Sequence, residues 1–164
     1  MEQSTRPGGL TTLAILNFIW AFFRLFQILG GAFLVVGLVM IGNLGENEAP
    51  PEMFQPLVQM LDQLERVGMT REILLAQTGG TLALDIIAAP LLLLAGIGYL
   101  KQKRFLGYWV GNLYGVLIST GTIILLFYLH GLDSRAVRLE LFIAFVYPLL
   151  TLGVLNTTFR RDFS

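Results

Sequence analysis

The amino-acid sequence predicts an all-α membrane protein: a bundle of four transmembrane helices with an extracytoplasmic amphipathic helical segment between the first and the second. Hydrophobic residues make up 55% of the 164 residues and charged residues only 13%, a composition outside the usual range of soluble domains of this size. Four apolar stretches are long enough to cross a bilayer, and basic residues gather on one side of them. We therefore expect a single transmembrane domain over residues 1–164.

The first apolar region, residues 10–41, is too long for one simple crossing, because a continuous helix of that length would run about 48 Å. In the favoured interpretation, residues 10–20 form a separate interfacial helix on the cytoplasmic side. The chain then crosses the membrane at about residues 20–42, with Trp20 and Arg24 among the lipid headgroups. This interpretation places Arg24 at the cytoplasmic surface.

A second placement of the first helix stays open. If residues 10–29 cross instead, Arg24 lies inside the membrane, where a charge is costly and requires a partner. Only this placement lets Arg24 reach Asp85 of the second crossing. Arg24 is therefore a candidate functional residue, and a rescue of Arg24→Leu by neutralising Asp85 would identify the placement.

The segment over residues 43–80 is predicted to be helical and extracytoplasmic. Pro50 and Pro51 suit the start of a helix. Beyond them, apolar residues recur at helical spacing and form one stripe, which lies on the bilayer, covers the bundle or docks on a partner subunit. The residues of this predicted docking face are Phe54, Leu57, Leu61 and Leu64.

Glycines divide the rest of this segment. Gly68 offers a C-terminal end for the amphipathic helix. A second short helix is expected to begin at Thr70, whose hydroxyl can cap it, and to end at Gly79 and Gly80. The second crossing then follows at residues 81–100.

The second crossing and the fourth, at residues 137–158, each contain a carboxyl group near the start and a proline in the middle. Pro90 and Pro148 are expected to kink these helices. Asp85 is the strongest candidate for a functional residue, because a carboxyl group inside a membrane usually faces a cavity, a partner charge or a proton path. Glu140 is the equivalent candidate in the fourth crossing. Both lie about one helical turn from the predicted extracytoplasmic start, where a structural role is the favoured interpretation.

The third crossing, residues 106–129, carries no charged residue. The aromatic residues Phe105, Tyr108, Trp109 and Tyr114 at its cytoplasmic end are typical of an interfacial belt. Small residues recur every four positions and predict a smooth face for close helix packing, within the chain or between chains. The residues of this glycine ridge are Gly107, Gly111, Gly115 and Ser119.

Basic residues near the helix ends predict the orientation, because lysine and arginine are enriched in short cytoplasmic loops. They occur before the first crossing, between the second and third, and after the fourth, which places both termini in the cytoplasm. These residues are Arg6, Lys101, Lys103, Arg104, Arg160 and Arg161.

The composition also excludes several kinds of chemistry. The chain has no cysteine and one histidine, His130, so it cannot build a thiol site or a multi-histidine metal centre. Eleven basic and eleven acidic residues cancel, which gives no field that favours nucleic acid. Motifs for phosphate, dinucleotide, zinc-protease or nucleophile-elbow sites do not occur. We therefore expect no catalytic residue, metal or cofactor.

Two sequence stretches suggest a resemblance. Residues 6–18 (RPGGLTTLAILNF) and residues 104–109 (RFLGYW) look like segments of small uncharacterised bacterial four-helix membrane proteins. The resemblance implies a compact bundle in the bacterial inner membrane, and it carries over no active-site residue, substrate or cofactor.

Three function classes are compatible with these observations. The favoured hypothesis is an accessory or structural subunit of a larger membrane complex, which packs on other subunits through the glycine ridge and the extracytoplasmic amphipathic face. The second is a small oligomeric transporter or channel that uses Asp85 or Glu140, although few polar residues line the crossings. A membrane enzyme is the third, and it lacks an acid–base pair. The expected partners are the lipid bilayer and other membrane subunits.

Overall fold

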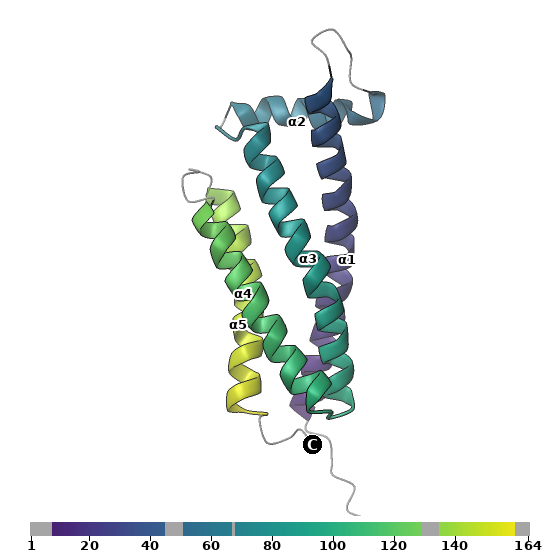
Figure 1. Cartoon of the computed structure of the whole chain (residues 1–164), viewed down its shortest axis with the longest axis vertical. Coiled ribbons are helices and arrows are strands. Elements are labelled where there is room, and N and C mark those ends of the chain that lie inside the picture. Colours follow the sequence, from purple (N-terminus) through teal and green to yellow (C-terminus); the bar gives the residue numbers. More distant parts are fainter. Residues whose placement is uncertain (1–7, 45–50, 67, 129–134, 160–164) are drawn as a thin grey trace, which may run out of the picture.

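The computed structural model describes residues 8–44, 51–66, 68–128 and 135–159 (Figure 1), without the side chains of residues 135–141 and 143. All regular structure in these ranges is helical. The elements in chain order are α1 (Gly8–Asn43), the 3-10 helix η1 (Glu52–Phe54), α2 (Gln55–Glu65), α3 (Arg71–Leu100), the π-helix η2 (Phe105–Trp109), α4 (Val110–Tyr128) and α5 (Arg135–Thr157).

The helices form two adjacent pairs, α1 with α3 and α4 with α5 (Figure 1). The ribbons of the two pairs converge where α3 turns into η2, and they diverge toward the opposite end, where α2 lies across the ends of α1 and α3. Leucine side chains bridge the wider gap between α3 and α4. An added Cβ on Gly80 would lie 2.7 Å from a methyl group of Leu125, and Gly121 accommodates Leu84.

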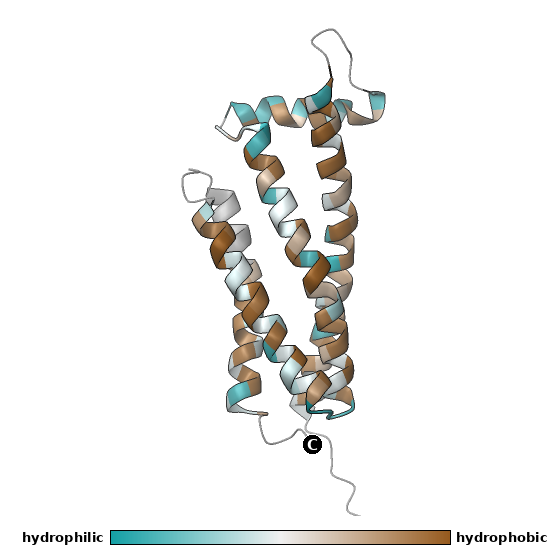
Figure 2. Cartoon of the chain, in the orientation of Figure 1, coloured by the Kyte–Doolittle hydropathy of each residue, from teal (hydrophilic) through white to brown (hydrophobic). Residues whose placement is uncertain are grey.

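Within the described residues, three helical segments are long and apolar enough to cross a membrane: α1, α3 and the continuous stretch from η2 through α4. α5 contributes a shorter apolar part, Ala144–Thr157. Hydrophobic residues cover the long helices, whereas α2 and the turn before η2 are more polar (Figure 2). Large apolar side chains point outward, with Phe22, Leu29 and Phe127 63%, 70% and 75% exposed. These features are those of a membrane protein.

α1 is one helix of 36 residues, about 54 Å long, with no break near Trp20. This corrects the expectation of a separate interfacial helix over residues 10–20. The physical reason is packing: Leu10, Ala14 and Ala21 are fully buried within the bundle. Because these residues are buried against other helices, α1 continues through residues 10–20, where hydrophobicity alone predicts a separate interfacial helix.

The amphipathic helix occurs as predicted in α2, with its apolar side turned inward. Phe54, Leu57 and Leu61 are buried in a cluster that also contains Leu38 of α1 and Leu74 of α3. Close packing on α1 requires glycine at residue 37, because an added Cβ there would lie 2.6 Å from Leu57 and 3.0 Å from Phe54. Leu64 is half-buried at the margin of the cluster. The predicted docking face is thus occupied by the chain itself.

The chain turns after α2 at Gly68, whose φ of +83° is in the left-handed region that glycine favours. Thr70 then occupies the N-cap position of α3 without a capping hydrogen bond from its side chain, unlike the predicted cap. α3 continues through Gly79 and Gly80, which corrects the expected end of a helix there. Gly80 supplies the space that Leu125 fills, so this glycine serves packing rather than termination.

The glycine ridge is buried against helices of the same chain. Gly107 lies against the backbone at Gly98 of α3, and Gly111 lies against the Tyr99 hydroxyl. Gly115 packs under Leu152 of α5. Ser119 is 7% exposed. Close contacts of this kind let helices associate in lipid through van der Waals packing, and here they join α4 to α3 and α5.

Candidate functional site

Small residues set the register between α1 and α3 and so decide which polar groups meet. An added Cβ on Gly96 would lie 3.0 Å from the Phe18 ring and 3.4 Å from the backbone oxygen of Ala14. Ala21 and Ala88 are fully buried in a neighbouring cluster. The two backbones therefore approach closely along this stretch, and Arg24 comes to lie opposite Asp85.

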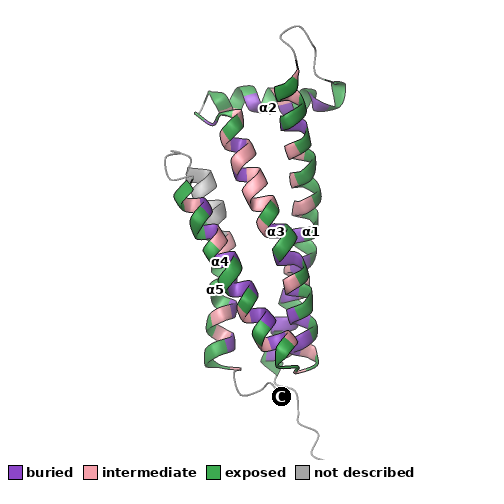
Figure 3. Cartoon of the chain, viewed as in Figure 1, coloured by how far each residue is buried: buried purple, intermediate pink, exposed green. Residues whose placement is uncertain are grey.

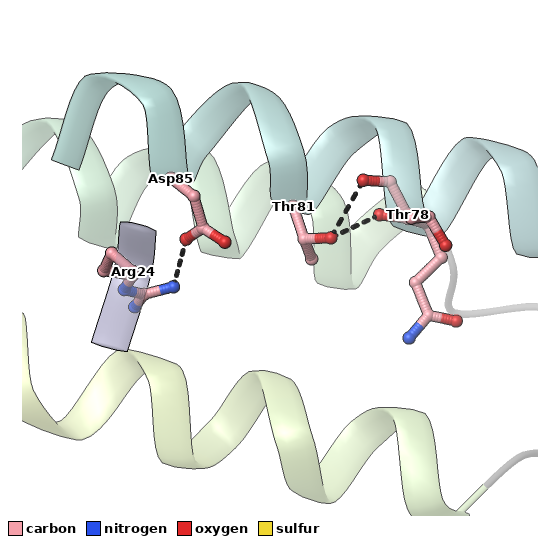
Figure 4. Close-up of polar contacts among 5 residues, drawn as sticks. Arg24, Thr78, Thr81 and Asp85 are labelled. Atoms are coloured by element: carbon pink, nitrogen blue, oxygen red, sulfur yellow. Dashed lines mark hydrogen bonds and ion pairs between the residues drawn. The ribbon is translucent and has the colours of Figure 1, made fainter. Parts of the chain in front are cut away.

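Arg24 and Asp85 form a buried ion pair between Nη1 of the guanidinium and Oδ1 of the carboxylate (Figure 4). The two residues are 8% and 3% exposed. The Tyr114 hydroxyl of α4 lies near both charges. Burying one charge alone in an apolar environment is very costly, and a paired, hydrogen-bonded arrangement makes it tolerable.

The ion pair corrects two expectations from the sequence. Arg24 does not lie a membrane thickness away from Asp85, as the favoured placement of the first helix requires. Asp85 is also near the middle of the 30-residue α3, because this helix begins at Arg71 rather than near residue 81. The side chain is therefore deeper in the bundle than one turn from a helix end.

A pocket of about 630 Å³ opens beside the ion pair, between α1, α3 and Ala144 of α5. Its volume is within the range of about 300–1,000 Å³ found for small-molecule sites. Arg24 and Asp85 contribute to its wall. The apolar part of the lining comprises Trp20, Phe23, Leu34, Leu74 and Leu82, with Gly30 and Gly31 leaving room along α1.

Three polar atoms of the pocket lining are buried and make no hydrogen bond to any part of the chain that the structure describes: Nε of Arg24, Oε1 of Gln27 and Oε1 of Gln77. Gln77 is 9% exposed. The neighbouring threonine is satisfied, since the Thr81 hydroxyl lies 3.0 Å from the backbone oxygens of Gln77 and Thr78 (Figure 4). Buried polar atoms usually have partners, so three such atoms on residues of one pocket make this part of the bundle a candidate site.

A second polar cluster lies inside the bundle, nearer the N-terminus of α1. Asn17 donates from Nδ2 to the backbone oxygen of Leu92 at 3.4 Å, and the Tyr147 hydroxyl of α5 donates to Asn17 Oδ1. The Trp20 and Tyr147 rings are in contact, with centroids 5.2 Å apart. This cluster joins α5 to α1, and Trp20 also lines the pocket.

A third polar cluster lies where η2 passes into α4. The Tyr108 hydroxyl donates to Asn156 Oδ1 at 2.8 Å, and Asn156 donates to Asn112 and to the backbone oxygen of Leu152. Phe105 and Trp109 are exposed, as an aromatic belt requires, whereas Tyr114 is 1% exposed. Tyr114 therefore belongs to the core beside the ion pair and not to the belt.

Two residues that the sequence singled out have no described side chain, and two residues of the polar clusters were not predicted. The backbone at Glu140 is part of α5, but its side chain is not described, and His130 lies outside the described residues. Gln77 escaped prediction, because the expected helix end at Gly79 and Gly80 placed it in a short extracytoplasmic helix outside the second crossing. Tyr147 also escaped, since its signal in the sequence is that of any interfacial aromatic residue.

Among the described residues, no group of three or more histidine, cysteine, aspartate or glutamate side chains could hold a metal ion. In comparisons with known proteins, no protein-family model, no curated protein and no solved structure matches the chain.

Proposed function

We propose that this protein is a small membrane binding protein of the transporter class, which takes up a small molecule in the pocket between α1, α3 and α5. The observation that carries the proposal is the combination of a 630 Å³ pocket with a buried ion pair in its wall and three buried polar atoms that lack partners in the described chain. Polar groups of this kind fix a ligand's orientation, and apolar walls supply the buried area.

The proposed role of the Arg24–Asp85 pair is to hold α1 and α3 in register and to orient polar groups toward the ligand. The pair is already formed, so binding does not require new charges to be buried. Nε of the Arg24 guanidinium is buried and has no hydrogen-bond partner in the described chain. The proposal involves no chemical step.

The proposed topology has four crossings in the cell inner membrane, with α5 as the fourth and both termini in the cytoplasm. The apolar part of α5 supports the fourth crossing. The basic turn between α3 and η2, at residues 101–104, supports the orientation. The segment between α1 and α3 is then extracytoplasmic.

Native mass spectrometry after purification in mild detergent tests the binding function. We expect the wild-type protein to carry a non-covalently bound small molecule. The variant Gly30→Phe should lose it, because a side chain at Gly30 meets no neighbouring atom within 4 Å and fills the pocket. The matched control is Gly153→Phe, which also meets nothing within 4 Å and lies away from the pocket. Equal occupancy of the two variants would contradict the proposal.

Transport is tested separately in proteoliposomes loaded with the co-purified molecule. The double variant Arg24→Gln and Asp85→Asn keeps the site neutral and removes both charges. We expect exchange of the molecule to fall to the rate of protein-free liposomes, while Gly153→Phe retains the wild-type rate. Undiminished exchange in the double variant would show that transport does not need the ion pair.

A second candidate function is the accessory subunit of a larger membrane complex. The observation that favours it is the outward face of α1, on which Phe22, Phe26, Leu29 and Phe33 are all more than half exposed. The glycine ridge and the apolar face of α2 are buried within the chain, so this candidate depends on α1 instead. Blue-native electrophoresis of solubilised membranes provides the test. Migration as a free monomer alone would argue against a subunit role.

A further inference from the structure

We propose that the pocket is opened and closed by a bend of α5 at Pro148, with residues 144–147 of α5 as the gate. The inference rests on the proposed binding function of the same pocket and adds how a molecule enters and leaves it. It follows from the position of the proline relative to the pocket, from the contacts that anchor the rest of α5, and from a contrast with the proline of α3.

The inward face of α5 changes from packed core to pocket wall at Pro148. Leu155, Thr151 and Pro148 recur at helical spacing on this face, and all three are fully buried. One turn before Pro148, Ala144 continues the same stripe, but it is only half-buried and lines the pocket. Along α5, the pocket thus begins where the proline interrupts the helix.

Pro148 weakens the connection between these two parts of α5. A proline has no backbone N–H, so the carbonyl of Ala144 receives no helical hydrogen bond from residue 148, and the proline ring crowds the same carbonyl. The Thr151 hydroxyl donates to the Tyr147 backbone oxygen at 3.0 Å, an arrangement that often bends helices. Both features make a bend of α5 easiest at the turn that borders the pocket.

The part of α5 that follows the proline is held in place. Leu152 packs over Gly115 of α4, where an added Cβ would lie 2.3 Å from the leucine side chain. At the pivot itself, the Tyr147 hydroxyl donates to Asn17 of α1. A bend therefore moves the gate relative to α1 and α3, while the C-terminal part of α5 stays packed.

α3 also contains a proline, but α1 holds this helix on both sides of it. Before Pro90, Leu82 packs against α1, where an added Cβ on Gly31 would lie 3.5 Å from the leucine side chain. After Pro90, Gly96 lies against Ala14 of α1. A bend at Pro90 would break contacts on one side, so we expect α3 to keep its shape. The proline of α3 is therefore the matched control.

Thiol labelling of the pocket wall tests the gate. The chain has no cysteine, so Gly31→Cys introduces a single thiol, at a residue that lines the pocket. The probe is methyl methanethiosulfonate, and intact-mass spectrometry of the protein in nanodiscs gives the labelling rate. Pro148→Ala restores the missing helical hydrogen bond and should slow labelling about twofold to tenfold, the range to which one hydrogen bond corresponds. Pro90→Ala should leave the rate unchanged.

Two further variants distinguish a gate from a packing defect. Thr151→Val removes the hydroxyl that bonds the Tyr147 backbone oxygen, so it should also slow labelling, by about twofold. Loss of packing would speed labelling instead. Gly153→Cys carries its thiol away from the pocket, and its labelling rate should be the same with proline or alanine at residue 148. Circular dichroism and gel filtration establish folding, and Thr151→Val decides the test if Pro148→Ala does not fold.

Two results would overturn the gate. Unchanged or faster labelling of Gly31→Cys in both the Pro148→Ala and the Thr151→Val backgrounds would show that α5 does not control access to the pocket. Equal slowing by Pro148→Ala and Pro90→Ala would assign the effect to the stiffness of either helix and not to a gate in α5.

The proposed binding function is decided separately, by native mass spectrometry. A wild-type protein without a bound molecule would contradict that function, whatever the labelling rates are. A bound molecule together with unchanged labelling would overturn the gate alone.

Discussion

Two polar clusters of the same bundle, only a few helical turns apart, differ in how completely their hydrogen bonds are made. Around Asn17, the amide and the Tyr147 hydroxyl satisfy each other and a backbone oxygen of α3, and helices pack tightly around them. Around Arg24, the ion pair is formed, yet three buried polar atoms of residues that line the pocket have no partner in the described chain. The first cluster stabilises the packing of the helices, whereas the second leaves buried polar atoms unpaired at a cost in stability, a pattern that functional sites often show.

The exposed fraction of the residues also differs between these two regions. Buried residues are concentrated where the helices converge, and exposed or half-buried residues predominate along α1 toward α2 (Figure 3). In the converging part, Leu10, Tyr99 and Leu155 are all 0% exposed. Substitutions that remove a contact already made should therefore lower the free energy of unfolding, whereas removal of a buried polar atom without a partner should not.

The largest effect is expected at the ion pair. Arg24→Leu alone leaves the Asp85 carboxylate buried without its partner and should lower the free energy of unfolding by about 3–5 kcal/mol. The double variant Arg24→Leu and Asp85→Leu should recover most of this loss, since it removes both charges. Unfolding in mixed micelles measures both. Independent, additive losses in the double variant would show that the two residues do not stabilise the fold as a pair.

A smaller loss is expected where glycines join α3 to η2. Gly98→Ala places a methyl group against the backbone of Gly107, which cannot move without separating the helices, so we expect a loss of about 1–3 kcal/mol. Gly30→Ala is the matched control in the open region, because its new methyl group meets nothing within 4 Å. Equal stability of the two alanine variants in the same unfolding assay would contradict the packing contrast.

The satisfied cluster should show a loss of about 1 kcal/mol. Tyr147→Phe removes the donor to Asn17 and keeps the ring, which isolates one hydrogen bond between membrane helices. Asn17→Leu removes the acceptor in the reciprocal way. If Tyr147→Phe is as stable as the wild type while Asn17→Leu is not, the backbone of Leu92 rather than Tyr147 is the important partner.

The smallest effect carries the opposite sign. Gln77→Leu replaces a buried side chain whose oxygen lacks a partner in the described chain, so stability should stay the same or rise by up to about 1 kcal/mol. Ligand occupancy measured on the same sample should fall. A loss of stability at Gln77 would place it with the structural residues and not with the site.

The sequence predicts the features that depend on neighbouring residues and does not predict those that depend on contacts between distant segments. Apolar length predicts the helices, helical spacing predicts the apolar face of α2, and spacing by four predicts the ridge at Gly107, Gly111 and Gly115, since these patterns are local. The register of α1 against α3 is not local. It depends on contacts such as Gly96 with Ala14, which are separated by most of α3 and the intervening chain. The pairing of Arg24 with Asp85 could therefore only be posed as an alternative.

The same limit explains why the helix end predicted at Gly79 and Gly80 is wrong. A glycine pair before an apolar stretch predicts a helix end as readily as a packing position, and the sequence around it contains no signal that distinguishes them. Leu125, the residue that needs the space, lies on another helix. For this reason the sequence did not indicate Gln77 as a residue of the site.

The neutrality of the Arg24–Asp85 pair has an electrical consequence. A transmembrane potential acts on a moving charge with about 2.3 kcal/mol per elementary charge per 100 mV. A pair that stays together moves no net charge of its own across the field when a ligand enters or leaves. Movement of an uncharged ligand through the pocket would therefore be electrically silent, and its direction would follow the concentrations on the two sides, whatever the membrane potential.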